Sequence, residues 1–257
     1  MNLAATGLTA ITPEFVTLLG PVFAAGMLVL ASHVPLGRAV LARGIVFLDL
    51  AIAQMAGLGV VLAHHIAGES AGFWPVQLGA MAAALLGALL LHTCERRAGA
   101  RQEAVIGVAF AVAACLSLLF MSHDLHGAER LQDLLVGQIV WTRWHDLPAL
   151  AAVAALVWAA RRVVQQGGAG FYALFALGIT VSVQVVGVYL VFASLIVPAL
   201  AARGRMGAAW GVGAAGYALG LAASLYFDLP AGAAIVVALA LCAVVWQFVF
   251  FRNTEGE

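Results

Sequence analysis

The stretch VFASLIVPALAARGR, residues 191–205, decides how many times this chain crosses a membrane. Its apolar part, Val191–Ala202, is too short to cross alone, because a helix needs about 20 apolar residues to pass through the hydrocarbon core. Arg203 and Arg205 follow at once. Whether the stretch counts as a membrane helix therefore depends on the side of the membrane to which these two arginines belong.

The composition of the whole chain is that of a membrane protein. Its 257 residues are 64% hydrophobic and 9% charged, with a mean hydropathy of +1.05, whereas a soluble domain carries about 25% charged residues. The formal net charge of zero argues against nucleic-acid binding. Cys94, Cys115 and Cys242 lie in or at the end of apolar segments, so no disulfide framework is indicated. We expect a single transmembrane domain over residues 1–257.

Eight other apolar segments are candidates for membrane spans. They are Glu14–Val34, Ile45–Ile66, Trp74–Cys94, Glu103–Met121, Leu147–Ala160, Phe171–Val188, Gly207–Phe227 and Ala231–Phe251. The first has no basic residues before it and is followed by Arg38 and Arg43. This pattern indicates a retained span with its N-terminus outside.

The basic residues are twelve arginines, with no lysine, and they fix the orientation. Ten lie on one side once the segments are threaded through a bilayer, and such an excess marks the cytoplasmic side. These ten are Arg38, Arg43, Arg96, Arg97, Arg101, Arg161, Arg162, Arg203, Arg205 and Arg252. Arg203 and Arg205 join that side only if Val191–Ala202 crosses as a short helix. The sequence thus predicts an all-α polytopic membrane protein with eight or nine transmembrane helices, including a short one near Pro198, N-terminus outside and C-terminus inside.

Two polar residues of the second span are candidates for a transport path. Ionisable side chains at membrane depth are costly and usually functional, which singles out Asp49, and Gln54 lies deeper. Because the two are five positions apart, about 500° around a helix, they point to different faces. A structural alternative stays open for Asp49, which could pair with Arg43 or cap the helix start. Further candidates for buried polar groups are Gln77, Ser182, Gln184 and Ser194.

Histidines gather in the segments that this topology places outside. His64 and His65 end the second span, and His123 and His126 lie in the loop after the fourth. Imidazole and carboxylate are ligands for borderline divalent metals such as zinc. These four histidines are therefore candidate metal relays, although they could equally be ordinary solvated loop residues.

No catalytic motif is present in the sequence. There is no Gly-x-Ser-x-Gly, no His-Glu-x-x-His and, without lysine, no phosphate loop of the P-loop type. We expect a transport subunit rather than an enzyme, with no bound cofactor. If transport is driven by ATP, a partner chain must hydrolyse the nucleotide.

Four blocks of sequence, in order along most of the chain, resemble one family of membrane proteins. They are Pro35-Leu36-Gly37 to Arg43 with the span Asp49–Gly59, Glu95-Arg96-Arg97 with Gln102–Gly107, Leu134–Gly137 with Trp144–Leu147, and Val186–Val191 with Ser194–Ala199 and Phe227–Gly232. The family is that of the integral-membrane permeases of ABC-type zinc and manganese importers, the ZnuB-like proteins. The fourth block is the most specific of the four.

The resemblance implies a mechanism and a set of partners. It implies a homodimer in the bacterial inner membrane that forms one path for a divalent metal, zinc before manganese, with cytoplasmic ABC ATPase subunits and a periplasmic metal-binding protein. The ATPase side would then hold Arg96, Arg97, Arg161 and Arg162, and the side of the binding protein would hold Arg130 and Arg143. The transported metal would meet Asp49, Gln54, His64, His65, His123 and His126.

The second span departs from the family pattern. The family has an aspartate and a histidine four positions apart on one helix face. When this sequence is aligned with the family pattern without gaps from Pro35, Leu50 stands at the aspartate position and Gln54 at the histidine position. A carboxylate–imidazole pair is thus replaced by an alkyl group and an amide. Whether His33 or His92 supplies the missing ligand stays open.

The inner loop after Arg162 is the second departure. The family has a segment there that inserts into the ATPase, whereas this chain has only residues 163–170. Eight residues make at most about two helical turns, and the glycines disfavour even that. Two other functions therefore stay open: an ATP-independent carrier or channel, and a non-transporting membrane scaffold on the same frame. A secondary carrier would usually show an internal repeat, and no convincing repeat relates the two halves.

Overall fold

Helices make up the part of the chain that the structure describes. The computed structural model describes residues 13–68, 72–122, 135, 137 and 139–251. Its α-helices are α1 (Pro13–Arg43), α2 (Leu48–Ala67), α3 (Phe73–Ala98), α4 (Gln102–Met121), α6 (Leu147–Ala159), α7 (Arg161–Gln166), α8 (Gly168–Val186), α9 (Val188–Ala201), α10 (Met206–Phe227) and α11 (Ala231–Phe251), and 3₁₀ turns cover Gly99–Arg101 and Ile139–Trp141. Seven helices are long and apolar enough to cross a membrane, and α6 and α9 are shorter apolar helices. The prediction of an all-α polytopic protein is confirmed.

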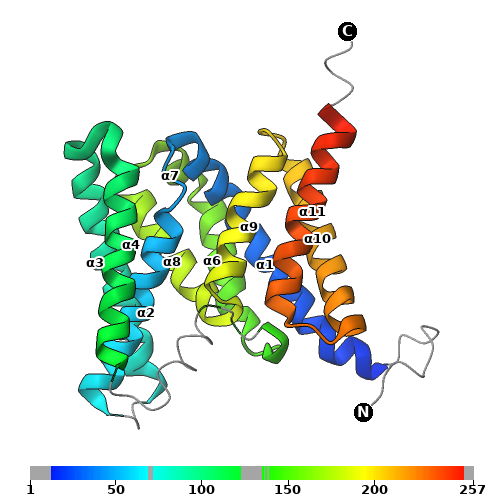
Figure 1. Ribbon diagram of the computed structural model, residues 1–257, viewed down its shortest axis with the longest axis horizontal. Coiled ribbons are helices and arrows are strands. Elements are labelled where there is room, and N and C mark those ends of the chain that lie inside the picture. The colour runs from blue at the N-terminus through cyan, green and yellow to red at the C-terminus, as the bar shows by residue number, and fades with distance from the viewer. Residues whose placement is uncertain (1–12, 69–71, 123–134, 136, 138, 252–257) are drawn as a thin grey trace.

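The arginines mark one end of the helix bundle. Figure 1 shows the α3–α4 connection, α7 and the α9–α10 connection at the end from which the C-terminus emerges, with the N-terminus at the opposite end. These three segments carry five of the arginines that the sequence placed on one side: Arg101, Arg161, Arg162, Arg203 and Arg205. We call this end the arginine-rich end. Its position agrees with the predicted alternation of the helices, including the short helix before Arg203.

Helix α1 is longer than the sequence predicted. We expected the first span to stop at Val34, but α1 continues through Pro35 to Arg43. Its 31 residues correspond to about 46 Å, more than the roughly 30 Å of a bilayer core, and α1 runs obliquely through the bundle (Figure 1). Proline removes one backbone hydrogen bond from a helix interior, and the close packing of α1 against α9, α6 and α10 holds the helix together there.

The chain reverses direction between α8 and α9 at a single glycine. Gly187 has φ 82° and ψ 163°, a conformation that is accessible mainly to glycine. Helix α9 has 14 residues and is therefore about 21 Å long. This is less than the roughly 30 Å of the hydrocarbon core, so the reversal at the start of α9 lies within the membrane. Gly137, from the connection before α6, packs directly on the backbone of Val186 and Gly187 at this point. The connection thus covers the reversal.

Small residues allow α10 and α11 to pack closely. A side chain at Gly216 would overlap Leu239, and one at Gly220 would overlap the backbone of Ile235. This pair of glycines therefore serves helix packing. At Gly207 and Gly211, the other pair four positions apart, an added methyl group would meet no atom of another helix within 4 Å in the described structure.

Candidate translocation site

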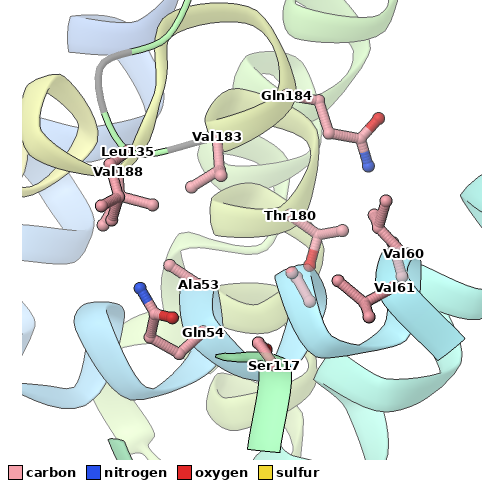
Figure 2. A pocket seen from close by; sticks show the side chains of 13 residues that line it. Ala53, Gln54, Val60, Val61, Ser117, Leu135, Thr180, Val183, Gln184 and Val188 are labelled. Atoms are coloured by element: carbon pink, nitrogen blue, oxygen red, sulfur yellow. The ribbon is translucent and has the colours of Figure 1, made fainter. Parts of the chain in front are cut away.

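A small cavity lies between α2, α4 and α8, with α3 and α9 at its margin (Figure 2). The centre of a water-sized sphere can move through about 20 Å³ of it, which is room for about one water molecule. Four polar side chains line it: Gln54 from α2, Ser117 from α4, and Thr180 and Gln184 from α8. Figure 2 shows Gln54 and Gln184 on opposite sides of this space.

The polar groups of the cavity differ in how well they are satisfied. The Ser117 hydroxyl donates to the carbonyl oxygen of Ala113 at 3.0 Å, which is how serine is usually accommodated within a helix. Thr180 is completely buried, and its Oγ1 atom has no hydrogen-bond partner in the described structure. Gln54 is also buried, with 8% of its surface exposed. Thr180 therefore offers an unsatisfied hydroxyl, and Gln54 a buried side-chain amide, to whatever enters the cavity.

The polar groups that line this cavity are neutral hydroxyls and amides, set among apolar side chains. Among the described residues that line it there is no carboxylate and no imidazole. Tight zinc sites use cysteine, histidine or carboxylate ligands, so the cavity suits a water molecule or a weakly held cation. The structure thus shows the consequence of the departure from the family pattern at Leu50 and Gln54. Gln54 lines the cavity, and no charged side chain among the described lining residues accompanies it.

Sequence reasoning missed Thr180 and Ser117. A usable signal was present, since Thr180, Ser182 and Gln184 form a polar series within the apolar helix α8, and residues four apart share a helix face. Thr180 and Gln184 do line the same cavity, whereas Ser182 is buried elsewhere. The expectation that Gln184 is buried was wrong. It is exposed at the edge of the cavity.

Asp49 does not line this cavity, as its separation from Gln54 predicted. It lies in the first turn of α2 with 1% of its surface exposed. Neither carboxylate oxygen has a hydrogen-bond partner among the described residues. The alternatives of an ion pair with Arg43 and of a side-chain cap on α2 are both unsupported, because Arg43 binds elsewhere and no capping hydrogen bond forms.

Arg43 instead holds α7 in place. Its guanidinium donates to the carbonyl oxygens of Val164 at 2.8 Å and Gln165 at 3.1 Å, at the C-terminal end of α7. It also donates to Ala39 at 2.8 Å, and its carbon atom lies 4.3 Å from the ring centroid of Phe171. Cations bind favourably both to the unpaired carbonyls at a helix C-terminus and to aromatic faces.

The short inner loop thus contains a helix. The glycines that we expected to oppose it come after it, since α7 ends at Gln166 and Gly167 has φ 80°. Arg161 and Arg162 begin α7 and are exposed, and Arg97 is exposed on α3. The side chain of Arg96 lies outside the described structure.

The outer candidates are only partly described. His64 is half-buried, with an Nδ1 atom that has no partner in the described structure, and His65 is exposed with its ring centroid 5.6 Å from that of Phe120. Arg143 is exposed, and its backbone N–H donates to Asp146 at 2.9 Å. His123, His126 and Arg130 lie outside the described residues. Within the described ranges, no three histidine, cysteine, aspartate or glutamate side chains gather as a metal site.

Neither His33 nor His92 replaces the missing ligand at the cavity, since neither lines it. His33 is buried in α1, and its Nδ1 atom lies 2.9 Å from both the Ser32 hydroxyl and the Val29 carbonyl oxygen. The Nδ1 atom of His92 lies 3.3 Å from Glu95. Local contacts account for the position of both rings.

Comparisons with known proteins agree with this architecture. The model of the ABC 3 transport family matches residues 16–166 and 163–250. A search of curated protein sequences gives no match. Among solved structures, PsaBC from Streptococcus pneumoniae in complex with a Fab is similar, with a TM-score of 0.70 and 20% identity over 92% of this chain and 95% of that chain. A structure described as an inward-facing metal-chelate type ABC transporter is similar with a TM-score of 0.66 and 12% identity over 98% of this chain and 93% of that chain.

The two structural likenesses show a shared fold. The family match extends over nearly the whole chain and therefore shows more. Together with the apolar helices and the arginine-rich end, it places this protein among membrane subunits that work with a separate ATPase. The chain belongs to the ABC 3 transport family, the membrane permeases of metal ABC transporters.

Proposed function

We propose that this chain is the permease of an ABC importer for a divalent metal ion, zinc first and manganese second. The observation that carries the proposal is the polar cavity at Gln54 and Thr180, within a bundle whose family is shown. Gln54 lies where the resemblance puts a metal ligand. The cavity therefore lies at the position along α2 where we expect the translocation path.

The cavity's neutral groups favour weak and transient binding. A transported ion has to leave its site in every cycle, and amide and hydroxyl oxygens hold a divalent cation less firmly than carboxylate and imidazole do. Selectivity for one metal would then come mainly from a periplasmic binding protein.

The partners would bind at opposite ends. A cytoplasmic ATPase would meet the arginine-rich end, where Arg43 fixes α7 and where Arg161 and Arg162 are exposed. A periplasmic metal-binding protein would meet the other end, where Arg143 is exposed. Two copies of the chain in the bacterial inner membrane would form one path.

An ATP-independent carrier is the second candidate. Two features of the sequence favoured a carrier: the short inner loop after Arg162, and the absence from the second span of the family's aspartate–histidine pair. The loop contains the anchored helix α7, so only the neutral character of the cavity still favours a carrier. The importer is therefore the better supported function.

Copurification tests this proposal. The protein would be purified from its native membrane in mild detergent, and the proteins that accompany it would be identified. We expect a stoichiometric ABC ATPase whose ATP hydrolysis rises with zinc or manganese and the cognate binding protein. Intact, folded permease that repeatedly carries no ATPase would contradict the importer and favour the carrier.

A further inference from the structure

Two carboxyl groups lie near the start of α2, at the arginine-rich end of the bundle. Glu103, in the first turn of α4, accepts a hydrogen bond from the backbone N–H of Phe47 through Oε1, at 3.0 Å. Phe47 is the residue that precedes α2. The other oxygen, Oε2, is buried and has no hydrogen-bond partner among the described residues. Glu103 therefore places a carboxylate from α4 against the first turn of α2.

Asp49 lies in that same first turn. It is 1% exposed, and both of its carboxylate oxygens are buried without a hydrogen-bond partner in the described structure. The backbone N–H groups of Asp49 and Leu50 are near the carboxylate but do not meet the geometry of a hydrogen bond. Three buried carboxylate oxygens thus lack a partner at one place.

The neighbouring basic and polar groups are engaged elsewhere. Arg43 is occupied by carbonyl oxygens and by Phe171. Glu95 pairs with His92, and the Gln102 amide donates to the Tyr172 hydroxyl at 2.7 Å. Buried charges are ordinarily paired or coordinate a metal. The described side chains around Asp49 and Glu103 supply no such pairing.

We infer that Asp49 and Glu103 form a binding site for a divalent cation, at the inner end of the translocation path. One cation between the two side chains would be coordinated by the oxygens that have no other partner in the described structure. Carboxylate oxygens are hard ligands of the kind that Mn²⁺ and Mg²⁺ prefer. Two carboxylates are too few to enclose an ion, so water would complete its coordination and release would remain easy.

The location suits an exit. Asp49 precedes Gln54 by five residues, a rise of about 7.5 Å along α2 toward the arginine-rich end. An ion that leaves the polar cavity along α2 toward the proposed cytoplasmic side would reach the carboxyl pair next. This role as an exit rests on the proposed import function, whereas the cation site itself does not.

Binding of Mn²⁺ to the purified full-length chain tests the site. The chain would be placed in lipid nanodiscs without ATPase or binding protein, and free Mn²⁺ would be measured from its electron paramagnetic resonance signal. The variants are Asp49→Asn and Glu103→Gln, which keep the side-chain shape and remove the charge. Glu95→Gln is the matched control, because it removes a carboxylate at the same end of the bundle outside the pair.

We expect wild type and Glu95→Gln to bind Mn²⁺ alike, and each pair variant to bind it about tenfold or more weakly. Two variants on different helices keep the test open if one of them fails to fold, which size-exclusion profiles would show. Equal binding by wild type and both folded pair variants would overturn the site. So would a wild-type chain that binds no Mn²⁺, since the pair would then be satisfied by a shared proton.

The assay separates this site from the import function. If the pair variants lose Mn²⁺ binding but the wild type shows no ATP-driven uptake, the cation site is supported and the proposed import function is contradicted. ATP-driven uptake with unchanged Mn²⁺ binding in the variants would remove the site and keep the importer.

Discussion

The guanidinium of Arg43 donates a hydrogen bond of 2.8 Å to the carbonyl oxygen of Val164, which joins the end of α1 to α7 across 121 positions of the chain. Helix α1 crosses the whole bundle, and α7 lies at its arginine-rich end. The contact therefore provides a mechanical link between the membrane core and the proposed docking surface of the ATPase.

Replacing Arg43 by alanine should weaken ATPase binding. Hydrogen bonds of charged groups each contribute about 1.5–3 kcal/mol, and their loss would leave α7 poorly positioned. We expect about tenfold weaker association of the ATPase with permease in nanodiscs, measured by titration. Arg38→Ala is the control, because Arg38 is on the same helix and contacts only the Met206 sulfur, at 3.7 Å, among the contacts seen here. Equal weakening by both substitutions would show that Arg43 has no special role.

Thr180→Val should lower metal uptake without loss of stability. The change keeps the shape of the side chain and removes a buried hydroxyl that has no partner in the described structure, so the free energy of unfolding should stay the same or rise by up to about 1 kcal/mol. Ser182→Ala is a matched control, because it removes another buried, unpartnered hydroxyl of α8 that does not line the cavity. Uptake that falls equally in both variants would mean that the cavity is not on the path.

The double substitution Leu50→Asp and Gln54→His should strengthen zinc binding. It restores a carboxylate and an imidazole four positions apart on one helix face, and both groups are good zinc ligands. We expect one additional bound Zn²⁺ per chain by calorimetry, together with slower release and lower uptake. A double variant with unchanged zinc stoichiometry would show that these positions do not face one common space.

Gly137→Ala should destabilise the reversal between α8 and α9. Gly137 has φ 72°, and a methyl group there would overlap the backbone of Val186 and Gly187. The cost should be about 1–3 kcal/mol, read as a lower midpoint of thermal unfolding in detergent. Gly107→Ala is the control. Gly107 lies inside α4 with open space around it, so alanine there should be neutral or slightly stabilising.

The architecture could be predicted from the sequence because the membrane imposes it. Apolar length sets the number of helices, and arginine placement sets their direction. The short helix α9 is the best example. It is too short to be recognised as a membrane span from its length, but the cytoplasmic position expected for Arg203 and Arg205 predicted it. The extension of α1 through Pro35 was missed, because a proline ends a helix only when packing does not hold both parts in line.

The site was less predictable because hydropathy does not tell which face of an apolar helix is buried. Gln54 was identified from its polarity. Thr180 has a small hydroxyl side chain that any helix tolerates, and only the absence of a hydrogen-bond partner among the described residues distinguishes it. The role of Arg43 depends on a contact with Val164 far away in the sequence. Glu103 was assigned to the start of a span, and its approach to the first turn of α2 required the packing of α4 on α2.

Metal uptake into proteoliposomes tests the central claim most directly. The permease, its copurified ATPase and the cognate binding protein would be reconstituted, and accumulation of radioactive zinc and manganese would be followed with ATP or ADP present. We predict accumulation with ATP alone, strongly reduced by Thr180→Val and unaffected by Ser182→Ala. Uptake of the same size with ADP, or no uptake of either metal by the complete and folded assembly, would contradict an ATP-driven metal importer.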